Sequence, residues 1–323
     1  MTKNPIIAGL SAGGTAAVLY LSLATGSGIG LLLFYLAPLP GFIAGFGWGV
    51  RAAGIAALSG TLLILVSLGV LPATAYCFSL AVPGVLITHY AFLYRLVGPQ
   101  NEQPQEGEPQ IEWYPVGNII LVVALYGGLL GILSVLLIGS SYEAYQNNVT
   151  STIDLIMSKA GDAGILKKLT PEILTQYKKL VLAILPASTA ILWSLFALMN
   201  LWLAAHIVRL SELMSRPWPE FSSMDYPLKA SLVFVAALFL SLILPGMAGL
   251  LMSALAGSLM MAFLLLGLAV VHNVTRTWQT RSLILFGTYV TVIFIGWGAL
   301  ILIVVGAVEP FVQMRRRLKI PDS

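Results

Sequence analysis

The stretch KASLVFVAALFLSLILPGMAGLLMSALAGSLMMAFLLLGLAVV, residues 229–271, decides the fold class of this chain. Lys229 is its only charged residue, and Pro245-Gly246 is its only strong break. One helix across the hydrocarbon core of a bilayer, which is about 30 Å thick, needs about 20 apolar residues. The run of 43 residues is too long for one such helix. We therefore predict two membrane helices joined by a tight turn.

The composition of the whole chain leads to the same fold class. Hydrophobic residues make up 58% of the 323 residues and charged residues 9%, whereas soluble domains carry about 25% charged residues. We expect an all-α fold, a polytopic transmembrane helical bundle in contact with the lipid bilayer. Cys77 is the single cysteine, which excludes an intrachain disulfide and a zinc site made of thiolates.

Breaks and polar loops divide the chain into six predicted segments. The apolar segments amount to about nine spans, within a range of about eight to ten. The segments are residues 1–97, four N-terminal membrane helices that include glycine-rich ones; 98–115, an acidic, proline-rich linker; 116–139, the fifth span; 140–180, an extramembrane amphipathic helical hairpin; 181–309, the C-terminal membrane helices, the last of them over 283–308; and 310–323, a basic tail.

The hairpin differs in kind from the membrane segments because it mixes lysines and acids with apolar residues. Ile153, Ile156 and Met157 recur at helical spacing. Thr170-Pro171-Glu172 is a typical helix start, with threonine as N-cap, proline in the first turn and an acid at the positive end of the helix dipole. We expect the second helix of the hairpin to continue into the sixth span.

The charge pattern does not fix the orientation in the membrane. A basic tail after a span usually stays on the cytoplasmic side, but an odd number of spans would place the two termini on opposite sides. A re-entrant half-span would remove the conflict, and residues 28–40, with Pro38 and Pro40, are the candidate. The apolar stretch after Lys3 is long for a signal peptide, so we expect an uncleaved first helix.

Familiar catalytic motifs are missing from the sequence. It has no phosphate-binding loop ending in Gly-Lys-Ser/Thr, no His-Glu-x-x-His zinc motif and no Gly-x-Ser-x-Gly nucleophile elbow. We expect no enzyme activity, no catalytic residues, no cofactor and no metal site. The basic tail is typical of a topology signal at anionic lipid, and we expect no nucleic-acid binding.

Polar side chains at membrane depth are the candidates for a ligand site, because burying them is costly unless they are paired or line a cavity. The predicted ligand-binding residues are Tyr35, Trp48, Asn200 and His206. The alternative for Asn200 and His206 is ordinary hydrogen bonding between helices. Asn200 and His206 lie on different faces of one helix, about 240° apart.

Two further groups of residues have predicted structural roles. Gly41, Gly45 and Gly49 recur four apart, which lets membrane helices approach closely. The packed pair, the second and third spans, could also form one wall of a cavity or the docking face for another subunit. The basic tail contains the predicted lipid or topology anchors, with Glu309 within reach of its arginines; the anchors are Arg315, Arg316, Arg317 and Lys319.

Several stretches resemble a known family. LAPLPGFIAGFGWG at residues 36–49, Glu112-Trp113-Tyr114-Pro115, GLAVVH at 267–272, and Glu309-Pro310-Phe311 followed by three arginines are similar to the bacterial YybS-like integral membrane proteins of unknown function. That family is distantly similar to the substrate-binding subunits of energy-coupling-factor vitamin transporters and to the rod-shape scaffold protein MreD. The resemblance implies a multi-pass protein of the bacterial inner (cytoplasmic) membrane.

Two functions remain open at this point. In the transporter subunits a proline-rich loop and a glycine-rich helix close over a vitamin, and residues 28–54 match that segment, although no ligand contact carries over. This resemblance favours a small-molecule-binding or transport-related protein, whose ligand the sequence does not name. The alternative is a membrane scaffold or assembly factor that recruits a protein partner through residues 140–180 and the basic tail.

Overall fold

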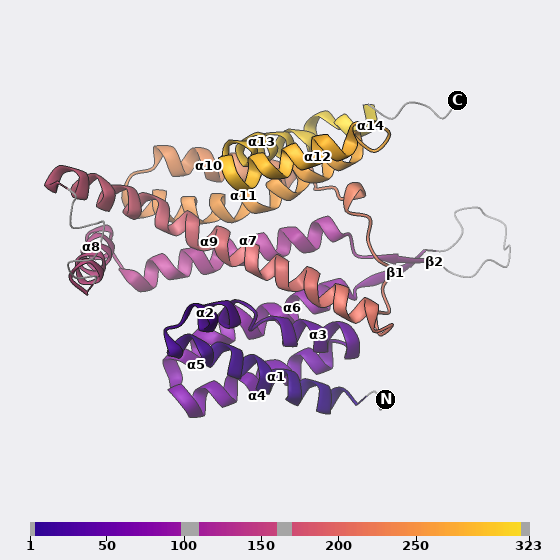
Figure 1. The fold of residues 1–323 in the computed structure, drawn as a ribbon, viewed down its shortest axis with the longest axis horizontal. Coiled ribbons are helices and arrows are strands. Elements are labelled where there is room, and N and C mark those ends of the chain that lie inside the picture. Colours follow the sequence, from indigo (N-terminus) through magenta and orange to yellow (C-terminus); the bar gives the residue numbers. More distant parts are fainter. Residues whose placement is uncertain (1–3, 98–109, 160–169, 318–323) are drawn as a thin grey trace. The chain divides into compact units, whose positions relative to one another are not determined.

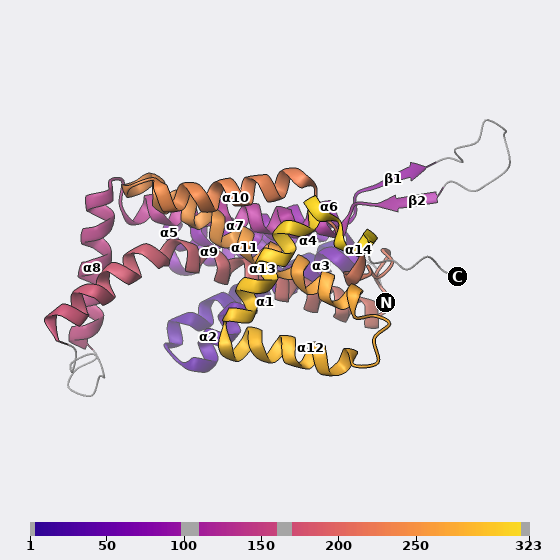
Figure 2. The same cartoon turned by 90° about the horizontal axis from the view of Figure 1, so that it is seen from above.

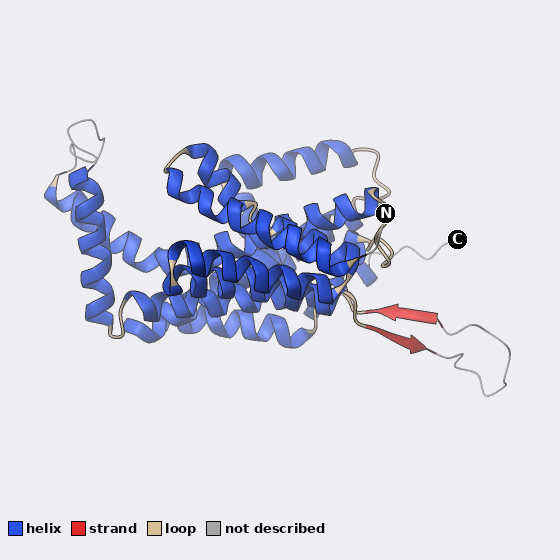
Figure 3. Ribbon diagram, turned by 90° about the horizontal axis from the view of Figure 1, so that it is seen from below, coloured by secondary structure: helices blue, strands red, loops and turns tan. Residues whose placement is uncertain are grey.

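The computed structural model describes residues 4–97, 110–159 and 170–317 (Figure 1). Helices make up almost all of this part of the chain, and its only strands are β1 (Tyr94–Val97) and β2 (Gln110–Trp113), red in Figure 3. The chain divides into two compact units. Unit 1 comprises residues 1–123 and 195–220, and unit 2 comprises residues 124–194 and 221–323. Of the three divisions, two fall inside α7 (Val116–Ile138) and α9 (Pro171–Leu210), and the third falls between Glu220 and Phe221.

Unit 1 begins with helices that pack through small residues. A β-carbon built at Gly9 of α1 would lie 2.6 Å from the β-carbon of Ile55 in α4, so only glycine permits this approach. A π-helical turn over residues 77–81 joins α5 to α6. The helices that lie wholly in this unit are α1 (Pro5–Leu21), α2 (Gly28–Tyr35), α3 (Leu39–Trp48), α4 (Val50–Leu68), α5 (Val70–Tyr76) and α6 (Val82–Ala91).

Unit 2 has a tightly packed centre built from α7, α9 and α11. The hydroxyl oxygens of Ser194 and Ser258 lie 2.7 Å apart, and the Ser258 hydroxyl also donates to the carbonyl of Ala124. A β-carbon at Gly257 would lie 2.7 Å from the carbonyl oxygen of Ala187. The helices that lie wholly in this unit are α8 (Tyr142–Lys159), α10 (Leu228–Ile243), α11 (Gly246–Val274), α12 (Arg281–Val290), α13 (Trp297–Val312) and α14 (Met314–Arg317).

The prediction of a multi-span helical membrane protein is confirmed, with fewer spans. Seven helices of the described part are long and apolar enough to cross a membrane. The bent pair of helices Arg281–Ile295 and Trp297–Val312 adds an eighth span if the two are taken together as one span. Helix α10 has the right composition but only 16 residues. The seven are Pro5–Thr25, Gly28–Trp48, Val50–Leu68, Val70–Ala91, Val116–Ile138, Pro171–Leu210 and Gly246–Val274.

The last predicted span, residues 283–308, is wrong as a single straight helix. Residues 281–295 and 297–312 are bent by 117° at Gly296, which has a positive φ of 76°. The candidate broken or re-entrant element is therefore residues 281–312, and not the predicted residues 28–40. Residues 28–40, the predicted half-span, do not stop at Pro40, because α3 continues to Trp48 and completes a span of 21 residues.

The predicted linker is corrected at its C-terminal end. Residues 110–113 pair antiparallel with residues 94–97, in the register Tyr94↔Trp113 and Leu96↔Ile111. Proline, glutamine and glutamate make up most of residues 98–109, and that composition predicts a linker. The short alternation of apolar and polar residues on either side of them, at 94–97 and 110–113, is the pattern of a strand pair. Residues 98–109 lie outside the described residues.

The helical hairpin contains both predicted helices. Helix α9 begins at Pro171, and the Ile173 amide donates to the Thr170 hydroxyl at 3.5 Å, so the predicted helix start is confirmed. The buried face of α8 carries Tyr145, Val149 and Ile153, which pack with Val135, Leu182 and Leu250. Ile156, predicted on the same apolar stripe, is exposed.

Candidate functional site

Two of the predicted ligand-binding residues meet in unit 1. The Asn200 amide donates to the carbonyl oxygens of Tyr35 and Phe196, each at 2.8 Å. The rings of Tyr35 and Phe196 are stacked with centroids 3.8 Å apart. Helix α2 ends at Tyr35. The Leu39 amide, which would donate to the Tyr35 carbonyl in a continuous helix, donates to the Leu36 carbonyl. Asn200 therefore satisfies a carbonyl left free by the break between α2 and α3, which is hydrogen bonding between helices.

The other two predicted residues lie elsewhere in unit 1. Trp48 is the half-buried last residue of α3, and no hydrogen bond or ring contact joins it to Asn200 among the described residues. His206 stacks on Trp202 with centroids 5.5 Å apart and meets the Trp218 ring edge-on at 6.0 Å. The four predicted residues do not form one site, since only Tyr35 and Asn200 come together.

The glycine stripe of α3 has three different roles. A β-carbon at Gly45 would lie 2.8 Å from the methyl carbon of Thr88, so Gly45 packs closely against α6. The corresponding atoms at Gly41 and Gly49 would meet nothing within 4 Å. Gly49 has a φ of 86° and forms the turn between α3 and α4. Of the three glycines with a predicted packing role, Gly45 thus has a close neighbour on another helix, whereas a β-carbon at Gly41 or Gly49 would have none within 4 Å.

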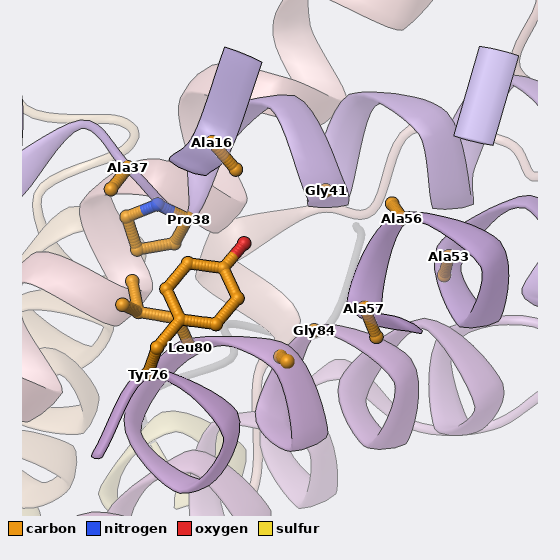
Figure 4. A pocket seen from close by; sticks show the side chains of 11 residues that line it. Ala16, Ala37, Pro38, Gly41, Ala53, Ala56, Ala57, Tyr76, Leu80 and Gly84 are labelled. Carbon is orange, nitrogen blue, oxygen red and sulfur yellow. The ribbon is translucent and has the colours of Figure 1, made fainter. Parts of the chain in front are cut away.

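Gly41 instead borders a small cavity in unit 1. Figure 4 shows the Tyr76 side chain directed into this cavity, which alanine, glycine and proline residues surround. The volume is about 20 Å³, enough for about one water molecule. The cavity is too small for an organic ligand.

A larger cleft lies in unit 2, between the loop before α10 and the ends of α11 and α13. Its volume is about 460 Å³, within the range of small-molecule sites, which is roughly 300–1,000 Å³. Most of its lining residues are polar. They are Ser222, Ser223, Asp225, Tyr226, Leu228, Asn273, Glu309, Pro310, Gln313 and Arg315.

A buried ion pair forms the floor of this cleft. The Arg315 guanidinium donates from Nε to Glu309 at 2.8 Å, and the Glu309 side chain is only 3% exposed. Gln313 has a positive φ of 53°, which turns the chain so that the Met314 amide donates to Glu309 at 2.9 Å. Removing one partner would leave the other charge buried and unpaired, which is strongly unfavourable.

Arg315 also fixes the loop that covers the cleft. Its Nη1 atom donates to the Met224 carbonyl at 2.6 Å and to the Ser222 carbonyl at 3.1 Å. Its Nη2 atom lies 3.4 Å from Asp225. The donors of Arg315, which was predicted as a lipid or topology anchor, thus bind the protein, and the anchor role stays a prediction. Arg316 and Arg317 belong to α14, and Lys319 lies outside the described residues.

Among the residues that line the cleft, two carboxylates, Asp225 and Glu309, share the guanidinium of Arg315. The Asp225 side chain is 58% exposed, so it is the acidic group that solvent reaches. Tyr226 donates to the Ala262 carbonyl at 2.9 Å, and burial raises the pKa of its hydroxyl. Such a site favours a ligand that carries hydrogen-bond donors or positive charge.

The bent pair of helices, α12 and α13, is close to this cleft in the chain. It starts eight residues after Asn273, and Glu309 and Pro310 near the end of α13 line the cleft. Helix α12 continues through a π-helical turn, Thr291–Ile295, to Gly296, where α13 turns back (Figure 2). His272 at the end of α11 lies 2.9 Å from the hydroxyl of Tyr289 in α12. No residue of α12 is buried. Within the described residues, no group of three or more His, Cys, Asp or Glu side chains could hold a metal ion.

Sequence reasoning found part of this site. It placed Glu309 within reach of the tail arginines, but it did not identify Asp225 or Asn273. Asn273 donates to the Ser222 carbonyl at 3.3 Å and thereby joins α11 to the loop. The sequence pattern that could have identified Asp225 and Asn273 is their position, since each lies at the edge of a long apolar run. Polar residues at such positions are usually assigned to the membrane interface and not to a site.

Comparison with known proteins identifies a family. The family described as Predicted membrane protein (DUF2232) matches residues 15–310. No curated protein and no solved structure matches the chain.

Proposed function

We propose that this chain, which belongs to the DUF2232 family of predicted membrane proteins, is a transport-related protein that binds a small polar molecule in unit 2. The observation that carries the proposal is the span broken at Gly296, with its 117° bend between residues 281–295 and 297–312. The cleft at the other end of α13 is the proposed recognition site.

A broken helix is informative in an apolar chain. Lipid cannot satisfy free backbone groups, so a break at membrane depth is tolerated where it is covered by protein or lines a polar cavity. Transporters commonly build their sites from such discontinuous helices. Isolated π-helical turns also occur frequently at functional sites. The side chains beside the break are exposed, Phe294 by 80% and Trp297 by 71%, and the break does not line the cleft. The π turn and the positive-φ glycine therefore favour a moving element that carries α13, whose other end borders the cleft.

The cleft gives the chemistry of the proposed ligand. Asp225 contributes an exposed carboxylate, Asn273 a side-chain amide, and Arg315 holds the surrounding loop in place. A cationic or donor-rich small molecule would bind the exposed carboxylate of Asp225. The resemblance of residues 28–54 to energy-coupling-factor binding subunits is sequence support for the same class of function, and it favours the bacterial inner membrane. Any active transport would use a partner ATPase or an ion gradient.

The test is native mass spectrometry of the protein purified gently from its own membrane, compared between two variants. Asp225→Asn removes the exposed carboxylate of the cleft. Asp154→Asn is the matched control, because Asp154 pairs with Lys178 at 2.6 Å far from the cleft residues in sequence. We expect a stoichiometric small molecule on the native protein and on Asp154→Asn, and its loss from Asp225→Asn. Absence of a small molecule from all three, or equal retention by all three, would contradict the proposal.

A scaffold function is the second candidate, favoured by α8. This helix lies outside the candidate spans, and its Leu155 and Ile156 side chains are exposed. Deleting the hairpin would be a poor test, because Tyr145 and Val149 cover apolar side chains of α7, α9 and α11. The double variant Leu155→Ser, Ile156→Ser changes only the exposed face. Loss of a retained protein partner in this variant, with no small molecule on the native protein, would favour the scaffold.

A further inference from the structure

The β1–β2 hairpin of unit 1 has one apolar face that is exposed. Because side chains alternate along a strand, the register places Tyr94, Leu96, Ile111 and Trp113 on one face and Arg95 and Glu112 on the other. Tyr94, Leu96 and Ile111 are 59%, 61% and 53% exposed. A two-stranded hairpin is marginally stable in water by itself, and its apolar face needs cover.

The base of this hairpin is held firmly. Arg216 is buried, which lowers the pKa of its guanidinium, and it donates to the Ala91 carbonyl at 2.8 Å and to the Tyr114 carbonyl at 2.7 Å. The Arg95 and Glu112 side chains pair at 2.7 Å on the opposite face. The hairpin therefore has a fixed attachment, and its apolar face has a defined direction relative to unit 1.

The attachment places the hairpin next to two membrane spans. Only Phe92 and Leu93 separate β1 from α6, and only Tyr114 and Pro115 separate β2 from α7 (Figure 3). Strands rise about 3.3 Å per residue, so Leu96 lies about 7 Å beyond Tyr94. The polar layer of each leaflet is about 5–8 Å thick. The four apolar side chains thus fall within reach of the layer that borders the two spans.

Aromatic side chains around the hairpin mark the same boundary. The rings of Tyr94 and Trp113 lie 5.6 Å apart, and those of Tyr90 and Tyr114 lie 5.4 Å apart. At the end of α9, the Arg209 guanidinium lies 4.9 Å from the centre of the Trp218 ring, which belongs to the loop after that helix. Tyrosine and tryptophan, together with basic residues, are the characteristic anchors of membrane proteins at the headgroup level.

We infer that the apolar face of the β1–β2 hairpin lies in the headgroup layer of the bilayer that two candidate spans, Val70–Ala91 and α7, cross. The exposed apolar side chains lie within a few residues of the ends of two candidate spans, and the aromatic residues at the base are typical of that layer. The Arg95–Glu112 pair then faces water. A protein partner on the same face is the competing occupant.

The test uses single-cysteine variants of the full chain. Cys77, the only native cysteine, is replaced by alanine, and Leu96→Cys and Val97→Cys are each labelled with an environment-sensitive fluorophore. The two positions are neighbours on opposite faces, and neither carries the Arg95–Glu112 pair. Ile111→Cys repeats the measurement on the second strand. The proteins are reconstituted in vesicles of phosphatidylcholine and phosphatidylglycerol with and without a headgroup-labelled quencher lipid.

The proposal predicts that the quencher lipid reduces fluorescence several-fold more at positions 96 and 111 than at position 97, and that aqueous iodide has the opposite preference. Equal quenching at the two faces would overturn it, because the apolar face would then have no preference for the lipid headgroups over the opposite face. Iodide access at position 96 in pure lipid vesicles, combined with protection in native membranes, would overturn it in favour of a protein partner.

Discussion

Helices α11 and α12 of unit 2 follow each other in the sequence, yet one is packed and the other is not. In the most apolar window of α11, 72% of the residues are buried, whereas no residue of α12 is. Glycine contributes to both outcomes. Gly267 brings α13 against α11, because a β-carbon there would lie 2.7 Å from the carbonyl carbon of Leu302. Gly296, with its positive φ, ends the helical path and turns the chain.

The comparison shows that hydropathy alone does not place a membrane helix inside a bundle. Small residues place a helix inside a bundle because they allow close contact between backbones. Hydrophobicity does not, since lipid is as apolar as a leucine side chain and helix association brings no hydrophobic gain. Helix α13 is held to α11 by glycine contacts and at its end by the Glu309–Arg315 pair, whereas α12 is tethered through the His272–Tyr289 contact.

The largest expected effect comes from releasing the end of α13. Glu309→Ala leaves the Arg315 guanidinium buried without its main partner, and we expect the free energy of unfolding to fall by about 3–5 kcal/mol. Unfolding in detergent can be followed by the loss of helical circular dichroism, together with hydrogen exchange in peptides of α11 and α13. Asp225→Ala is the control, and because this carboxylate is 58% exposed we expect a loss of about 0–1 kcal/mol. Equal losses would show that Arg315 is not held by Glu309.

The second prediction applies one substitution to both helices. Gly267→Ala forces a β-carbon into the Leu302 backbone, and we expect a loss of about 1–3 kcal/mol in the free energy of unfolding. Gly287→Ala on α12 meets nothing within 4 Å. We expect it to be neutral or to stabilise by up to about 1 kcal/mol, since alanine favours a helix over glycine. A destabilising Gly287→Ala would mean that α12 is packed after all.

The third prediction concerns the bend. Gly296→Ala places a side chain at a φ of 76°, at a cost of roughly 1–2 kcal/mol, so the bent geometry should be populated less. The measurement is the distance between spin labels at Phe286→Cys and Val304→Cys, both exposed positions, in a Cys77→Ala background. We expect a broader distance distribution than with Gly296. An unchanged narrow distribution would show that packing, and not the glycine, sets the bend.

The smallest expected effect is local. Tyr289→Phe removes the hydroxyl that meets His272 at 2.9 Å, a contact worth about 0.5–1.5 kcal/mol. We expect faster hydrogen exchange in peptides of α12 and unchanged exchange in α11. Thr288→Val, next to it on the same helix, serves as the control because its hydroxyl bonds within the helix to Ile284. Equal exchange in the two variants would show that the His272 contact does not restrain α12.

Part of the site could be predicted from local sequence. Glu309 and Arg315 are six residues apart at the end of an apolar run, so their proximity followed from chain length. Asn200 was recognised as an unusual polar residue at membrane depth, but its partner, the carbonyl of Tyr35, lies 165 residues away. The roles of Gly41, Gly45 and Gly49 could not be separated, because close packing, an open surface and a positive φ all favour the same residue.

The sequence by itself determined which solvent the chain occupies and where several of the breaks between apolar segments fall. The apolar run at 229–271, the helix start at Thr170-Pro171 and the breaks between spans each depend on the local chemistry of a few consecutive residues. Only the tertiary structure decided that Arg315 binds the loop at Ser222 and Met224 and that the last apolar segment bends at Gly296. Solvent preference belongs to each side chain, whereas a hydrogen-bond partner or a backbone angle is settled by what the rest of the chain packs against it.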